Sequence, residues 1–207
     1  MTQPIASAGP HRLRVLAGWG VVLAVMAVPL IIAAQSPLLQ WRQPIYILSG
    51  FAGVLGLALL FVQPLLARGA LGGLTPARSR QIHIWGGALL CVTLVVHVGG
   101  LWITSPPDVV DALLFRSPTP FSFWGVVAMW SVIVTALLAA TRRRLRLRPE
   151  TWRRAHLSLA VLTVGCTIVH ALWIDGTMGT ASKVGLCVLT ALTLIYAVRQ
   201  RRIAAQR

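Results

Sequence analysis

The sequence predicts an all-α fold, a six-transmembrane-helix bundle with both termini cytoplasmic, and three observations predict it. Hydrophobic residues make up 57% of the 207 residues, and the mean hydropathy is +0.77. Only 11% of the residues are charged, whereas soluble domains usually carry about 25%. The apolar residues form six long uncharged runs, and the 19 Lys and Arg residues lie between or beyond them. We therefore expect a multi-pass protein of the cell (inner) membrane.

The net charge of +15 raises a second possibility, because a basic excess also characterises nucleic-acid-binding proteins. Such proteins carry their basic residues along a folded, soluble surface. In this chain the basic residues instead separate long apolar runs. We therefore expect the lipid bilayer as a partner and no nucleic acid.

The six uncharged runs define the predicted spans in order, namely residues 15–41, 43–67, 81–107, 117–141, 155–174 and 184–198. Crossing the hydrocarbon core as a helix takes about 20 apolar residues. The first five runs meet this length, and the first is longer than the apolar part of a secretory signal. The sixth is short unless Lys183 snorkels or the helix begins near Met178. None shows the strict alternation of a barrel strand, so helices are expected.

The charges of the loops predict the orientation of the spans. Sixteen of the 19 basic residues fall on one side, which includes both ends of the chain. The other side holds Arg42, Arg116, Lys183, Asp108, Asp111 and Asp175. The positive-inside rule places both termini in the cytoplasm. We expect a cytoplasmic N-terminal segment at 1–14, one membrane domain at 15–198 and a basic cytoplasmic tail at 199–207.

Four of the five histidines lie inside predicted spans, His83 and His97 in the third and His156 and His170 in the fifth. The members of each pair are 14 positions apart. Fourteen residues return to within about 40° of the starting direction and rise about 21 Å, so both members share a helix face. Because the third and fifth spans run in the same direction, His83 and His156 share one depth, and His97 and His170 share another. The spacing predicts two bis-imidazole sites stacked across the membrane.

Two opposed imidazoles favour haem iron over a bare metal ion. Zinc and copper sites generally use three or four protein ligands, and no Asp, Glu or Met accompanies these histidines at depth. Haem iron already has four nitrogen ligands, so two axial histidines complete its coordination. We interpret the nearby small residues as room for a planar ring, although close helix packing also favours them. These residues are Gly86, Gly87, Gly99 and Gly100.

Two segments resemble the ferric-reductase-like transmembrane domain of ferric reductases, NADPH oxidases and the haem subunit of bacterial methionine sulfoxide reductase systems. They are RQIHIWGGALLCVTLVVHVGGLW from Arg80 and TWRRAHLSLAVLTVGCTIVHALW from Thr151. The resemblance extends from the second span to the sixth, and the double histidine pair is its specific part. It implies that two haem b groups are bound, with His83, His97, His156 and His170 as the axial ligands of their iron.

The sequence departs from this family in two ways. Ferric reductases and NADPH oxidases continue into flavin and nicotinamide domains, whereas this chain ends within ten residues of its last predicted span. Its electron donor is therefore expected to be another molecule. The methionine sulfoxide reductase haem subunit usually lacks the inner histidine of the third span, whereas His83 is present here. This difference favours two haems and argues against that subgroup.

We expect an oxidoreductase component for electron transfer, with no catalytic acid–base residues. Electrons arrive at the cytoplasmic side from a flavoprotein reductase or the quinol pool, with FMN or FAD on the partner or at this face. They pass through both haems to an acceptor outside, which is ferric iron, oxygen or a periplasmic redox partner. Two alternatives stay open at this point. One is a quinone-reactive dihaem cytochrome b that anchors a larger dehydrogenase, and the other is a non-redox metal transporter.

Four arginines lie close in sequence to the inner histidines, namely Arg78, Arg80, Arg153 and Arg154. Arginine binds carboxylates in a bidentate manner, so these side chains would suit the propionates of an inner haem. They serve equally well as topology signals that meet anionic lipid headgroups.

Overall fold

The computed structural model describes residues 9–205, so residues 1–8 of the predicted N-terminal segment and 206–207 of the predicted tail lie outside the described residues. The described part is helical and contains no strand. Its elements are α1 (Pro10–Ala34), the 3₁₀ helix η1 (Pro37–Leu39), α2 (Pro44–Ala67), α3 (Pro76–Thr104), α4 (Pro106–Leu113), α5 (Pro120–Thr141), α6 (Pro149–Trp173) and α7 (Thr180–Ala205). All but η1 and α4 are long and apolar enough to cross a membrane, which confirms the predicted bundle of six spans.

Proline marks the start of every helix from α1 to α6. Its fixed φ suits the first helical position, where the missing N–H would have no helical partner in any case. The predicted spans began later at α3 and α6, because the uncharged runs exclude the arginines that follow Pro76 and Pro149. These helices therefore extend past the apolar run at their basic end. The prolines were the sequence signal for these boundaries.

Two features between the spans differ from the prediction. Residues 106–113 form α4, an amphipathic helix of 8 residues that the sequence analysis had divided between a span and a loop. The sixth span begins at Thr180, so Lys183 lies inside α7. Its side chain is only 7% exposed, and its Nζ donates to the carbonyl of Ile174 at 2.7 Å. Lys183 therefore covers the carbonyl end of α6.

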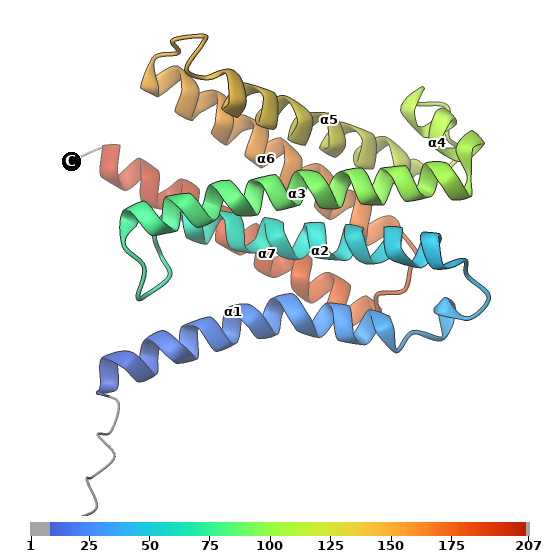
Figure 1. Cartoon of the computed structure of the whole chain (residues 1–207), viewed down its shortest axis with the longest axis horizontal. Helices are drawn as coiled ribbons and strands as arrows, with labels where there is room; N and C mark the ends of the chain where they lie inside the picture. Colours follow the sequence, from blue (N-terminus) through green and yellow to red (C-terminus); the bar gives the residue numbers. More distant parts are fainter. Residues whose placement is uncertain (1–8, 206–207) are drawn as a thin grey trace, which may run out of the picture.

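Five of the spans form a closed circuit of packed neighbours. α2 packs against α3 and α7, α6 packs against α5 and α7, and α3 contacts α5. α1 lies outside this circuit against α2 and α7, along the lower edge of the view in Figure 1. Successive spans run in opposite directions, so the start of α1 and the end of α7 lie at the same end of the bundle.

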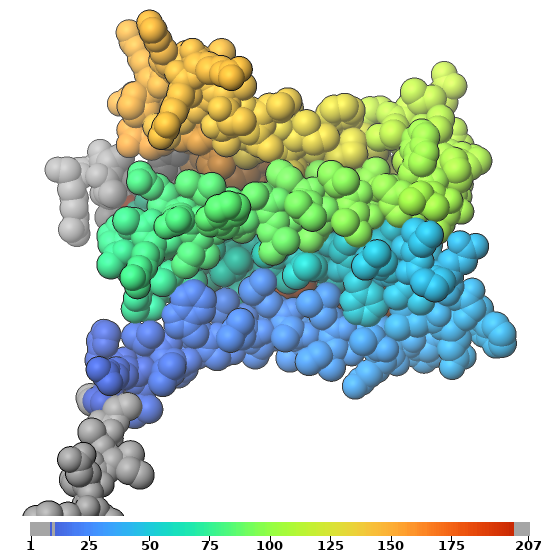
Figure 2. Space-filling model, in the orientation of Figure 1, coloured from blue at the N-terminus to red at the C-terminus, as the bar shows by residue number. Residues whose placement is uncertain are grey.

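α3 crosses one face of the bundle between α1 and α5, as Figure 2 shows. Only Ser79 and Thr93 of this helix are buried. Most of its apolar side chains are at least partly exposed, as expected for a helix whose outer face meets lipid tails.

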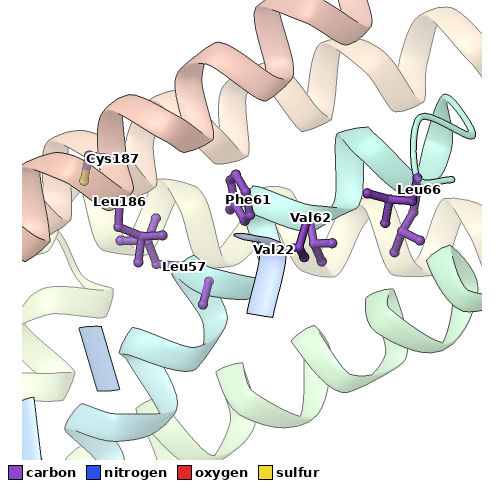
Figure 3. Close-up of a cluster of buried hydrophobic side chains, with 9 residues drawn as sticks. Val22, Leu57, Phe61, Val62, Leu66, Leu186 and Cys187 are labelled. Carbon is purple, nitrogen blue, oxygen red and sulfur yellow. The ribbon is translucent and has the colours of Figure 1, made fainter. Parts of the chain in front are cut away.

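The main buried cluster joins α1, α2 and α7 (Figure 3). It consists of Val22, Leu57, Ala58, Phe61, Val62, Leu66, Leu71, Leu186 and Cys187. α2 contributes most of these residues and is the central helix of the bundle. Because lipid tails are as apolar as these side chains, the cluster stabilises the bundle through close packing and dispersion.

Replacing Leu186 with Ala is expected to lower the free energy of unfolding by about 2–5 kcal/mol, because it leaves a cavity in this cluster. Leu186 is 2% exposed, whereas Leu192 on the same helix is 54% exposed and provides the matched control. Thermal unfolding in detergent, followed by circular dichroism, should show a clear loss for Leu186→Ala and little change for Leu192→Ala. Equal losses would contradict the packing of this cluster.

Candidate functional site

The structure brings together both histidine pairs that the sequence predicts. The ring centres of His83 and His156 lie 6.1 Å apart, and their planes are at 75°. The ring centres of His97 and His170 lie 6.4 Å apart, and their planes are at 81°. α3 and α6 are not closely packed along their described lengths. The imidazoles therefore meet across a space that the helix backbones leave open.

After the predicted orientation, His97 and His170 are called the outer pair, and His83 and His156 the inner pair. Both imidazoles of the outer pair are held by a neighbouring helix. His97 Nδ1 lies 2.8 Å from the carbonyl oxygen of Ser49 in α2. His170 Nδ1 lies 2.8 Å from the carbonyl oxygen of Phe121 in α5. Because a carbonyl oxygen only accepts, Nδ1 must carry the proton in both rings. Each Nε2 then keeps its lone pair and is available to a metal ion.

The inner pair is held less uniformly. His83 Nδ1 donates to the carbonyl of Gln63, but the distance is 3.2 Å. His156 Nδ1 is buried and has no hydrogen-bond partner among the described residues. Its ring instead stacks on Trp152, with ring centres 5.2 Å apart and planes at 25°. The guanidinium of Arg142 lies 5.0 Å from the centre of the Trp152 ring. A stacked column therefore links the basic end of the bundle to His156.

Two of the four glycines near the histidines of α3 serve close helix packing, the second of the two roles considered for them in the sequence. A Cβ at Gly100 would overlap Ser49 Oγ, and one at Gly86 would lie 2.8 Å from Gln63 Nε2. These glycines let α2 approach α3 and do not leave room for a ring plane. Gly87 is looser, with Gln63 Nε2 at 3.8 Å from its Cβ position, and Gly99 has nothing within 4 Å.

Two glycines that the sequence analysis missed lie directly against the outer imidazoles. A Cβ at Gly53 would lie 3.0 Å from His97 Nδ1, and one at Gly125 would lie 2.6 Å from His170 Nδ1. Both glycines are in spans next to a histidine-bearing helix. The available sequence signal was a glycine at the same membrane depth as the histidine, in the span next to it. Matching the two depths, however, requires knowing how the neighbouring spans are aligned, and the sequence does not show this.

Three further buried polar atoms lie next to α3. Ser49 Oγ, Gln63 Nε2 and Gln63 Oε1 have no hydrogen-bond partner among the described residues. They belong to the two α2 residues whose carbonyls accept from His97 and His83. Buried polar atoms without partners are costly, and these three lie on the face of α2 that packs against α3.

The other residues noted in the sequence take ordinary positions. Arg154 pairs with Glu150 at 3.7 Å, and both side chains are exposed. Trp102 and Trp173 are about half exposed at the opposite end of the bundle, as aromatic residues of a membrane interface are. Asp108 accepts a hydrogen bond from Ser105 Oγ at the start of α4.

The donor set fits iron in a haem. Two imidazoles that bind one metal ion from opposite sides through nitrogen atoms at about 2 Å hold their ring centres about 6 Å apart, close to the spacing in both pairs. Across residues 9–205, no cluster of three or more His, Cys, Asp or Glu side chains forms a complete metal site. Each level offers two imidazoles, and a haem supplies the other four nitrogen ligands.

A bundle of membrane spans with paired histidines at two depths is the architecture of a membrane electron-transfer component. The family model described as "Ferric reductase like transmembrane component" matches residues 49–167, and the chain belongs to this family. The match covers most of α2 to α6 and includes His83, His97 and His156, whereas His170 lies just beyond it. The family implies an oxidoreductase type of function. No curated protein and no solved structure matches the chain.

Gly100 and Gly165 provide a test of the close contact between α2 and α3. Gly100→Val should destabilise the protein by about 1–3 kcal/mol, because the new side chain meets Ser49. Gly165→Val should have little effect, since Gly165 is exposed on α6 and nothing lies within 4 Å of its Cβ position. Thermal unfolding of both variants in the same detergent checks this expectation, and an unchanged stability of Gly100→Val would refute this register of α2 against α3.

Proposed function

We propose that the protein is a membrane haem b electron-transfer subunit. It passes electrons from a flavin or quinol donor on the cytoplasmic side, through two stacked haems, to an acceptor outside the cell membrane. The acceptor classes are ferric iron, oxygen and a periplasmic redox partner. The proposed membrane domain is residues 15–198, flanked by cytoplasmic segments at 1–14 and 199–207. The electron donor is proposed to be a separate molecule.

One observation supports this proposal above the others. Two histidine pairs, at two depths, face each other with ring-centre distances of 6.1 and 6.4 Å. In three of the four imidazoles Nδ1 is bonded to a helix carbonyl, which leaves Nε2 for a metal. A transported cation would need further ligands along its path, whereas a haem iron needs only these two.

The chain's own residues would hold the haems rather than carry out bond chemistry. His83 and His156 would ligate the iron of the inner haem, and His97 and His170 that of the outer haem. A bound haem supplies an iron that accepts and releases one electron at a time. The surrounding apolar spans exclude water, and the carbonyl bonds fix the orientation and basicity of the imidazoles. No side chain is required to transfer a proton.

The two ends of the bundle differ in charge. The arginines near the starts of α3 and α6 and the Arg-rich segment at 142–154 lie at the end shared by the start of α1 and the end of α7. Under the positive-inside rule this is the cytoplasmic end. A basic face is suited to an acidic donor protein as well as to lipid headgroups. The inner haem level lies nearer to this end.

The haem proposal predicts a specific spectrum. The purified protein should show low-spin b-type bands in its reduced-minus-oxidised spectrum. His97→Ala should retain about half of the haem, because only one of the two levels loses a ligand. His11→Ala is the matched control, since His11 lies in no histidine pair, and its haem content should equal that of the wild type. A protein that binds no haem, or an unchanged haem content in His97→Ala, would contradict the proposal.

The proposed orientation can be measured separately. Single cysteines at Arg144 and Asp111 lie in connections at opposite ends of the bundle. In intact cells, a membrane-impermeant thiol reagent should label Asp111→Cys, and it should label Arg144→Cys only after the membrane is opened. The native cysteines are replaced by Ala in both proteins, because Cys91, Cys166 and Cys187 lie inside the spans. Labelling of Arg144→Cys in intact cells, and of Asp111→Cys only after the membrane is opened, would contradict the proposed orientation and the proposed direction of electron flow.

A further inference from the structure

The carbonyls that accept hydrogen bonds from the imidazoles have the same 14-residue spacing as the histidines. In α2, the accepting carbonyls belong to Ser49 and Gln63, which are 14 residues apart. In α5, Phe121 accepts from His170, and α5 runs antiparallel to α6. Counting 14 residues forward from Phe121 in α5 gives Thr135, and counting 14 residues back from His170 in α6 gives His156. Thr135 is therefore the residue of α5 that corresponds to His156. Each imidazole therefore has an equivalent carbonyl in the neighbouring helix, although His156 makes no bond to the carbonyl at its position.

The residue four positions after each of these carbonyls differs between the two levels. At the outer level it is glycine, Gly53 in α2 and Gly125 in α5. At the inner level it is alanine, Ala67 in α2 and Ala139 in α5. In a helix, the N–H of residue i+4 bonds to the carbonyl of residue i, so the two positions lie side by side. An imidazole that bonds the same carbonyl must share this space with any Cβ at position i+4.

The hydrogen-bond distances follow this difference. At the glycine level both distances are 2.8 Å, and a Cβ at either glycine would lie within 3.0 Å of the imidazole. At the alanine level one distance is 3.2 Å, and the other imidazole has no partner among the described residues. Stacking on Trp152 positions His156 without a carbonyl. Glycine therefore accompanies a short bond, and alanine a long bond or none.

We infer that these four small residues are positioning residues that set different reduction potentials for the two levels, the outer one being lower. Transfer from the inner to the outer haem is then uphill and depends on oxidation of the outer haem by the acceptor. This inference rests on the proposed function, because it concerns the haems proposed there. A stronger bond from Nδ1–H to a carbonyl makes the imidazole a more basic ligand. A more basic ligand stabilises ferric over ferrous iron and lowers the potential of the haem. The outer level has two strong bonds, and the inner level has one weak bond.

The test is equilibrium potentiometry of the purified full-length protein, in which dithionite reduces ferric to ferrous iron, one electron per haem, and the b-type absorption is followed. The wild type should show two components with different midpoint potentials, and His97→Ala should keep only the component with the higher potential. Ala67→Gly should lower the higher component, because His83 can approach the Gln63 carbonyl. Gly125→Ala should raise the lower component, because the new methyl group displaces His170 from the Phe121 carbonyl.

Two control variants separate this effect from a general change in the bundle. Gly165→Ala adds a methyl group to α6 where nothing lies within 4 Å, and Ala140→Gly removes an exposed methyl group beside Ala139. Both should leave both components unchanged. If Gly125→Ala loses the outer haem, that loss supports the close approach of His170. Ala67→Gly then decides the inference, because it removes a methyl group and adds no atom that could displace a haem ligand.

The inference and the proposed function fail in different ways. If the wild type binds two haems but Ala67→Gly leaves the higher component in place or raises it, the inference is overturned and the proposed function stands. The same holds if His97→Ala retains the lower component. If the wild type binds no haem, both are overturned.

Discussion

The hydrogen bond between an imidazole N–H and a carbonyl of the adjacent helix is the interaction on which the site depends. It joins α3 to α2 at two depths and α6 to α5 at one. A membrane helix already uses its carbonyls internally, so this second bond forms only where the helices approach closely and in one register. For His83, His97 and His170 the bond therefore fixes the depth of the histidine, its tautomer and the direction of its free nitrogen at the same time.

Much of this arrangement follows from periodicity in the sequence. The 14-residue spacing places His83 and His97 on one face of α3, and His156 and His170 on one face of α6. The alternating direction of the spans makes α3 and α6 parallel, so the pairs match in depth. These conclusions need only helical geometry and the number of intervening spans, which is why the ring contacts agree with them.

The parts that the sequence analysis missed depend on neighbours in space. Gly53 and Gly125 matter because of the ring that each faces, and Gly86 and Gly100 because of the α2 side chains that fill them. Neither role follows from the position of the glycine in its own helix. The early starts of α3 and α6 are different, because their signals, Pro76 and Pro149, lie in the sequence itself and a helix continues beyond the hydrocarbon core when its backbone allows it.

The lack of close packing between α3 and α6 has a consequence for biogenesis. The α2–α3 and α5–α6 hairpins are each held by extensive contacts of their own, so each can form separately during insertion. A group ligated by residues of both hairpins would bind only the assembled bundle and would stabilise it by mass action. In chains made when this group is scarce, the two hairpins would be joined mainly through α7 and the α3–α5 contact, and such chains would be more exposed to membrane proteases. Supply of the prosthetic group would thereby control how much of the protein accumulates.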